Sequence, residues 1–101
     1  MDADRPQVVC LCGSLRFSHL FASERERLTS TGVIVLAPEP VGEEPTPALR
    51  AALAELHLRR IDLADEVRVV SEGGYVGEAT RREIEYARNS GKRISSVEPL
   101  E

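Results

Sequence analysis

The sequence predicts an α/β fold: a three-layer sandwich with a Rossmann-like or flavodoxin-like parallel sheet of four strands. Two observations lead to this prediction. Short apolar runs alternate along the chain with longer stretches whose apolar residues recur at helical spacing. The first runs are apolar at successive positions, as in strands that helices cover on both faces. Right-handed crossovers between such strands give the expected order 2-1-3-4.

The expected strands are four short apolar runs, each bounded by residues that stop a strand. They cover residues 8–12, 33–37, 67–70 and 94–97. Gly13-Ser14 ends the first run, and Pro38 ends the second. The segment from Pro38 to Pro47 holds four prolines, too many for it to join a sheet, because proline cannot donate to a strand ladder. Pro99 limits the last strand.

Three helices are expected between these strands. The first begins near Phe17 and stops at Thr31-Gly32. The second runs from Pro47, a residue suited to a first turn, to about Ala64. The third runs from Glu78 or Thr80 to about Asn89. The inward stripe expected for the second helix comprises Leu49, Ala52, Leu53, Leu56 and Ile61.

Length and composition limit the function classes. Residues 1–101 are enough for one domain only. The net charge of -4 argues against a partner that is a nucleic acid polymer, and 4% aromatic residues cannot form an extensive stacking platform. No stretch approaches the ~20 apolar residues of a membrane span, and the start of the sequence lacks the pattern of a secretory signal. We therefore expect a cytoplasmic protein without membrane contact.

The two cysteines, Cys10 and Cys12, are separated by one residue and therefore share one face of an extended strand. A single such pair is no disulfide framework. The other soft ligands in the sequence, His19 and His57, are not spaced from it as in zinc motifs. We expect buried thiols that pack as small hydrophobic groups, with no metal and no cofactor.

In a sheet of this order, ligands bind beyond the carboxyl ends of the strands where the order reverses, between the first and third strands. One loop there is Gly13-Ser14-Leu15-Arg16, which leads into a helix N-terminus. Free backbone N–H groups and a guanidinium suit a phosphate at that point. Alternatively, Gly13 permits a tight turn and Ser14 or Ser18 caps the helix. The loop matches neither dinucleotide nor nucleoside-triphosphate motifs, so a monophosphate is the more economical ligand.

The other loop, residues 71–80, is rich in glycine and carries Tyr75, Gly77 and Thr80. Thr80 and Glu83 have the spacing of a capping box, in which Glu83 would reach back to the backbone of Thr80. The alternative is a carboxylate in the first turn of a helix, which stays ionised and nucleophilic. Local sequence leaves both interpretations open.

Asp62 and His57 are candidates for a second catalytic group, because a spatial neighbour of Glu83 can serve as acid or base. Both residues also fit a solvated helix face beside Arg59 and Arg60. Asp65, just before the third strand, is expected to form a turn or a backbone hydrogen bond.

Three segments resemble the nucleoside 2-deoxyribosyltransferase superfamily, especially its nucleoside 5'-monophosphate N-glycosidase branch. Residues 9–16, Val-Cys-Leu-Cys-Gly-Ser-Leu-Arg, resemble the first strand and phosphate loop of that branch. Residues 64–70, beginning Ala-Asp, resemble its Ala-Asp-Val-Val-Val strand. Residues 83–92 resemble its nucleophile helix, which ends in Gly-Lys. The resemblance covers most of the chain.

The resemblance implies hydrolysis or transfer at the N-glycosidic bond of a nucleoside 5'-monophosphate, without a cofactor. Glu83 would attack the anomeric carbon and form a glycosyl-enzyme, with Asp62 or His57 as the second catalytic group. The 5'-phosphate would bind Gly13, Ser14 and Arg16. The opposite loop would contribute Gly77, Thr80 and a hydroxyl group from Tyr75.

Two positions differ from the pattern of these relatives. Cys10 stands where relatives often have a tyrosine that orients the nucleophile, and His57 stands where they have a catalytic aspartate. A non-catalytic module that binds or senses nucleotides is therefore the alternative function. A receiver or flavodoxin-like domain fits less well, since neither an acidic cluster nor an aromatic flavin site is present. By analogy with larger relatives, whose pockets are completed by further elements, we expect a homodimer.

Overall fold

The computed structural model describes residues 5–42 and 44–99. Its elements are β1 (Val8–Gly13), a 3-10 helix η1 (Leu15–Phe17), α1 (Ser18–Ser30), β2 (Ile34–Leu36), α2 (Pro47–Leu63), β3 (Glu66–Val70), α3 (Glu78–Asn89) and β4 (Arg93–Ser96). All four predicted strands and all three predicted helices are confirmed, with boundaries that differ by one or two residues.

The sheet is parallel throughout and has the order β2-β1-β3-β4, as predicted. In the central pair, Cys12 of β1 lies opposite Val69 of β3, and Gly13 lies opposite Val70. The order reverses between β1 and β3, so the carboxyl ends of these two strands define the place for a ligand.

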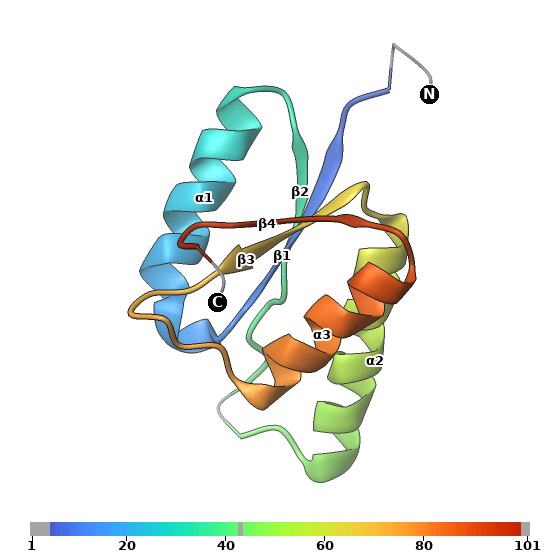
Figure 1. Cartoon of the computed structure of the whole chain (residues 1–101). Helices are drawn as coiled ribbons and strands as arrows, with labels where there is room; N and C mark the ends of the chain where they lie inside the picture. The colour runs from blue at the N-terminus through green and yellow to red at the C-terminus, as the bar shows by residue number, and fades with distance from the viewer. Residues whose placement is uncertain (1–4, 43, 100–101) are drawn as a thin grey trace.

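The helices cover both faces of the sheet, with α1 on one side and α2 and α3 on the other (Figure 1). Alternate residues of β1 point to opposite faces. Val9 and Leu11 pack on the α1 side, whereas Cys10 and Cys12 pack on the side of α2 and α3. All four side chains are buried, which explains why the strand is apolar at every position.

The stripe predicted for α2 was partly wrong. Leu49 and Leu56 are exposed, and the buried positions of α2 are His57 and Ile61. The first half of α2 extends beyond the sheet, so its leucines have no strand to cover (Figure 1). The predicted start is confirmed: Pro47 is the first helical residue, and the hydroxyl of Thr46 accepts a hydrogen bond from Leu49 N at 3.1 Å.

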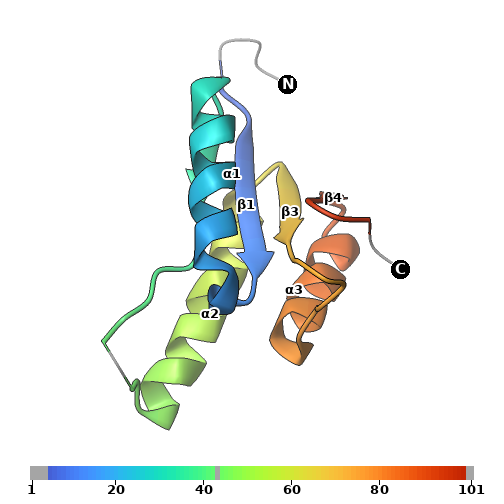
Figure 2. The ribbon, with the colours of Figure 1, turned by 90° about the vertical axis from the view of Figure 1, so that its left-hand side faces the viewer.

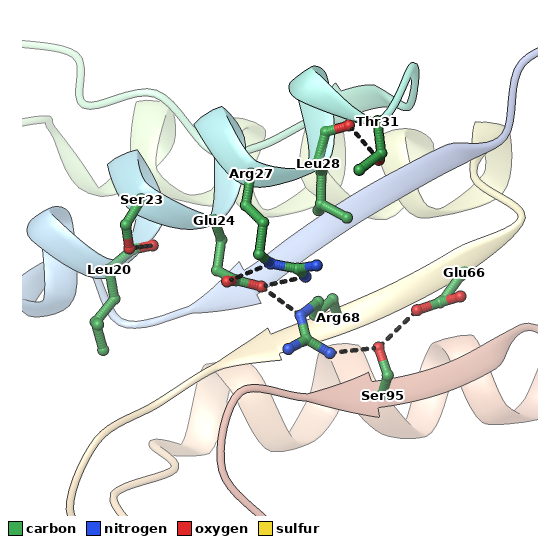
Figure 3. Close-up of polar contacts among 9 residues, drawn as sticks. All are labelled: Leu20, Ser23, Glu24, Arg27, Leu28, Thr31, Glu66, Arg68 and Ser95. Atoms are coloured by element: carbon green, nitrogen blue, oxygen red, sulfur yellow. Dashed lines mark hydrogen bonds and ion pairs between the residues drawn. The ribbon is translucent and has the colours of Figure 1, made fainter.

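A polar network joins α1 to β3 and β4 on the α1 side of the sheet (Figure 3). Glu24 of α1 accepts hydrogen bonds from Arg27 and from Arg68 of β3. Arg68 also donates to Ser95 of β4 at 3.2 Å, and Ser95 donates to Glu66 at 2.6 Å. Glu24 is buried, so its pairing with two guanidinium groups compensates for the loss of water.

The helices α2 and α3 begin at the end of the sheet toward which β1 and β3 point (Figure 2). Loops after the strands and the first turns of two helices therefore meet at one edge. Among residues 5–42 and 44–99, no helix is both long and apolar enough to cross a membrane.

Candidate functional site

The loops after β1 and β3 meet, as the strand order predicts. The guanidinium of Arg16 lies over the ring of Tyr75, 4.0 Å from its centroid. Phe17 contacts the same ring edge-on, with centroids 6.0 Å apart. A cation over an aromatic face is attracted by the ring quadrupole, so Tyr75 holds Arg16 at the edge of the sheet. Its hydroxyl lies beside Gly77, where an added Cβ would be 3.1 Å away from it.

Gly13 and Ser14 both have structural roles in this edge. A Cβ on Gly13 would lie 2.3 Å from the carbonyl oxygen of Val70, so only glycine fits between the two strands. The hydroxyl of Ser14 accepts a hydrogen bond from Arg16 N at 3.3 Å and caps the 3-10 helix. Ser14 therefore caps the 3-10 helix in the structure. The Arg16 side chain is exposed at the loop.

The capping-box interpretation of Thr80 and Glu83 was wrong. The helix α3 begins at Glu78 with Gly77 at its N-cap, so Thr80 lies inside the first turn, where it is buried. A capping box requires the threonine at the N-cap position itself. Glu83 is instead free to point away from its own backbone.

Glu83 faces the strand β1 and helix α2. Its Oε1 lies 3.8 Å from Nε2 of His57, and its side chain is 18% exposed. It is the sixth residue of α3, in the second turn and not, as predicted, in the first. Burial raises the pKa of Glu83 above its usual value, whereas the adjacent His57 acts in the opposite direction. The expectation of an anion stabilised by the helix terminus was therefore wrong, because that effect is confined to the first turn.

His57 occupies the centre of the cluster. Its side chain is buried, and its Nε2 lies 3.3 Å from Cys12 Sγ and 3.9 Å from Cys10 Sγ. On the other side of the ring, Arg60 Nη1 approaches Nδ1 at 3.4 Å. A guanidinium can only donate, so Nδ1 accepts and the ring proton is on Nε2, facing Glu83 and Cys12.

The two thiols are the part of the cluster that sequence reasoning missed. Hydrogen bonding with Cys12 lowers the pKa of Cys10 to about 6, and the same contact together with burial raises the pKa of Cys12 far above its usual value. His57 lies 45 positions from Cys12 in the sequence. Metal motifs are defined by spacings between positions in the sequence, so they cannot detect this contact.

The other candidate acids lie elsewhere. Asp62 accepts a hydrogen bond from Tyr86 Oη at 2.6 Å and pairs with Arg59 at 3.2 Å, in an exposed network near the end of α2. The structure therefore does not bring Asp62 to Glu83. Asp65 accepts from the backbone of Val8 at 2.9 Å, as expected of a residue with a backbone role.

Glu83 is reached from solvent through a groove of about 570 Å³ between α2 and the start of α3. Two cationic side chains that sequence reasoning did not select, Arg50 and Arg82, line this groove with Glu83. Its wall is otherwise mostly apolar, with Leu58, Ala54 and Ala79 among the lining residues. With Glu55 also in its lining, the groove carries two carboxylates and two guanidinium groups, so it suits a small polar ligand.

Three solved structures share this fold. The model aligns with a 2-deoxyribosyltransferase from Bacillus psychrosaccharolyticus at a TM-score of 0.74 and 19% identity, over 93% of this chain and 77% of that one. A 2-deoxyribosyltransferase from Leishmania mexicana aligns at 0.70 and 15% identity, over 90% of this chain and 63% of that one. A conserved protein from Enterococcus faecalis V583 aligns at 0.66 and 14% identity, over 91% and 63%.

No protein-family model and no curated protein matches the sequence. The structural alignments show that the chain has the α/β fold of deoxyribosyltransferases. It spans about two thirds to three quarters of the length of these structures.

Proposed function

We propose that the protein hydrolyses or transfers the N-glycosidic bond of a nucleoside 5'-monophosphate, with Glu83 as the nucleophile. The observation that carries this proposal is the carboxylate of Glu83, which faces His57 Nε2 at 3.8 Å and lines an open groove between α2 and the start of α3. Two solved enzymes of this fold are deoxyribosyltransferases, which supports chemistry on a nucleoside.

In this proposal, Glu83 attacks the anomeric carbon and the base departs with the bonding electron pair. An oxocarbenium-like transition state needs an adjacent carboxylate of this kind. The adjacent His57 opposes the effect of burial by favouring the ionised form of Glu83. Water or an acceptor base then releases the sugar from Glu83. In this proposal His57 takes the positioning role that a tyrosine has in the relatives that the sequence resembles.

The sugar phosphate would bind at the loop after β1. Ser14 follows Cys12 by two residues, which corresponds to roughly 7 Å of extended chain. That separation suits a furanose ring with its 5' arm, anomeric carbon toward Glu83 and phosphate toward Ser14 and Arg16. A phosphate bound away from the reacting atom orients the sugar and leaves the electronics of Glu83 unchanged.

The test is release of free base by the reduced, metal-free protein from a panel of ribo- and deoxyribonucleoside monophosphates, measured by chromatography. We expect release by the wild type and none above the uncatalysed rate in Glu83→Gln. The matched control is Glu85→Gln, an exposed carboxylate two residues further along the same helix, which should retain the wild-type rate. No release from any nucleotide, or equal release by Glu83→Gln, would contradict the proposal.

A second function, nucleotide binding without turnover, is favoured by two observations. Cys10 occupies the strand position at which related enzymes often carry the orienting tyrosine, and burial raises the pKa of Glu83. Thermal stabilisation by a nucleotide, with no base released across the panel, would support this sensing module in place of the enzyme.

We also propose that the protein acts as a homodimer. Leu49, Leu56 and Leu63 are exposed at intervals of seven residues and so share one face of α2. Sedimentation or light scattering should give twice the chain mass in the wild type and the chain mass in Leu56→Glu. A wild-type mass of one chain at every concentration would contradict the homodimer.

A further inference from the structure

Two thiols and one imidazole converge beside Glu83. Cys10 and Cys12 occupy alternate positions of β1, so both side chains point toward α2 and α3. His57 projects from α2 between them, and the ligand atoms Sγ, Sγ and Nε2 all lie within 4.8 Å of one another. All three residues are buried.

The separations match those of a tetrahedral metal site. With Zn–S near 2.3 Å and Zn–N near 2.0 Å, a tetrahedral ion holds sulfur and nitrogen about 3.6 Å apart. The distances from His57 Nε2 are 3.3 Å to Cys12 Sγ and 3.9 Å to Cys10 Sγ, on either side of that value. A nitrogen and an oxygen on the same ion would be about 3.4 Å apart. Glu83 Oε1 is 3.8 Å from Nε2, but Glu83 is not among the three residues whose ligand atoms all lie within 4.8 Å of one another, so its carboxylate must move toward the thiols to become the fourth ligand.

We propose that Cys10, Cys12 and His57, with Glu83 as the fourth ligand, bind a single thiophilic divalent cation, for which zinc is the best fit. Two sulfurs and an imidazole select zinc over magnesium or calcium, which prefer oxygen ligands. Binding releases the two thiol protons to solvent and leaves two thiolates, one carboxylate and the ion, a net charge of -1. Arg82, which favours the ionised form of Glu83, offsets that charge.

The ion has a route to the site. Cys10 and Cys12 are 0% exposed, but Glu83 lines the open groove between α2 and α3. An ion that enters there meets the carboxylate first and the thiols behind it. The dry interior then favours retention of the metal, because water has little access to the ligands and does not readily displace them from the ion.

The outer face of His57 gives a specific test of this site. Metal coordination through Nε2 requires a neutral ring with its proton on Nδ1. Arg60 now donates to Nδ1 at 3.4 Å, so it opposes that tautomer and must swing outward when a metal binds. In Arg60→Gln, the amide oxygen can accept the Nδ1 proton, as second-shell groups of metal-binding histidines commonly do. This variant should bind the metal more tightly than the wild type.

One consequence rests on the proposed function. A metal coordinated by Glu83 and His57 makes both side chains unavailable to the sugar, so zinc should inhibit base release. Inhibition that chelation reverses is expected in the wild type. Metal binding is measured independently of turnover, so failure of the glycosidic activity would leave the metal site standing, and the reverse also holds.

The experiment is a titration of the reduced protein with Co²⁺ under anaerobic conditions, followed by displacement with Zn²⁺. We expect one ion per chain by native mass spectrometry, with the sulfur-to-cobalt charge-transfer band and the strong visible bands of a tetrahedral Co²⁺ site. Cys12→Ser and His57→Gln should lose these bands. The control His19→Gln alters the exposed histidine and should retain them.

Two further measurements guard against variants that fail to fold. Circular dichroism must show native helix content in each variant, and the Tm of the unmodified wild type should rise when one equivalent of zinc is added. Absence of a stoichiometric adduct in the wild type, a spectrum without thiolate bands, or weaker binding by Arg60→Gln would overturn the proposal.

Discussion

Gly13 lies where β1 and β3 approach most closely at the edge that carries the site. An added Cβ would lie 2.3 Å from the carbonyl oxygen of Val70, which is backbone and cannot rotate away. Gly13→Ala should therefore push the strands apart at an overpacking cost of about 1–3 kcal/mol. We expect a lower midpoint of urea unfolding, and Ser23→Ala, at an exposed position of α1, is the control. An unchanged midpoint would show that the strands separate freely.

Thr46 determines where α2 begins. Its hydroxyl accepts from Leu49 N at 3.1 Å, which satisfies one of the free donors of the first turn. Thr46→Ala should cost about 1 kcal/mol of the free energy of unfolding, whereas Thr46→Ser should cost much less because serine also caps helices. Chemical denaturation of the three proteins measures this difference. Equal losses in both variants would assign the effect to the methyl group and not to the cap.

At the scale of elements, the contact between α1 and β3 depends on an ion pair in a largely apolar setting. Arg68 is paired with Glu24, and their side chains are 20% and 11% exposed. Glu24→Gln would leave a guanidinium without its anion between α1 and β3, which should cost about 1–3 kcal/mol of the free energy of unfolding. The conservative Glu26→Gln, on the exposed side of α1, is the control and should change little.

The same pair predicts how this stability depends on pH. Hydrogen bonds from Arg27 and then Arg68 lower the pKa of Glu24 below its usual 4.5. A carboxyl whose pKa is lower in the folded protein stabilises it above the unfolded value, and that contribution is lost as the pH falls. The Tm difference between wild type and Glu24→Gln should therefore persist at neutral pH and narrow below about 4.5. A constant difference down to pH 3 would contradict the assigned role.

The elements themselves were predictable from sequence, because each depends on neighbours along the chain. Successive apolar residues in β1, Pro47 at the start of α2 and Gly91 after α3 report local conformation, and the structure places these elements within one or two residues of the prediction. The inward face of α2 was not predictable in the same way. Whether Leu56 or His57 faces the core depends on how far α2 extends beyond the sheet, which is a tertiary property.

The site was predictable in position but not in chemistry. The strand order implies that the loops carrying Arg16 and Tyr75 meet, and they do. The capping box failed because the pattern Thr-x-x-Glu does not reveal that Gly77 already caps α3. The cluster of Cys12, His57 and Glu83 draws on a strand and two helices, so no spacing along the chain could indicate it.

At the scale of the whole molecule, two places compete for the phosphate of a nucleotide. One is the loop at the end of β1, where Tyr75 holds Arg16. The other is the groove beside Glu83, where Arg50 and Arg82 lie. Each of these two places is formed by elements that are far apart in the sequence. A bound nucleotide should therefore stabilise the entire fold and not one helix.

A deoxynucleoside 5'-monophosphate should therefore raise the Tm well above the effect of the same nucleoside without phosphate. At a hundred times its Kd, a ligand adds about 2.7 kcal/mol to the free energy of unfolding. In a domain of this size, that corresponds to a shift of roughly 10–20 °C. Arg16→Met should abolish the advantage of the phosphate, whereas Arg25→Met, an exposed arginine on α1, should keep it. If Arg50→Met or Arg82→Met abolishes the advantage of the phosphate while Arg16→Met does not, the phosphate binds in the groove. The sugar must then approach Glu83 from the side of α2 and not from the side of β1.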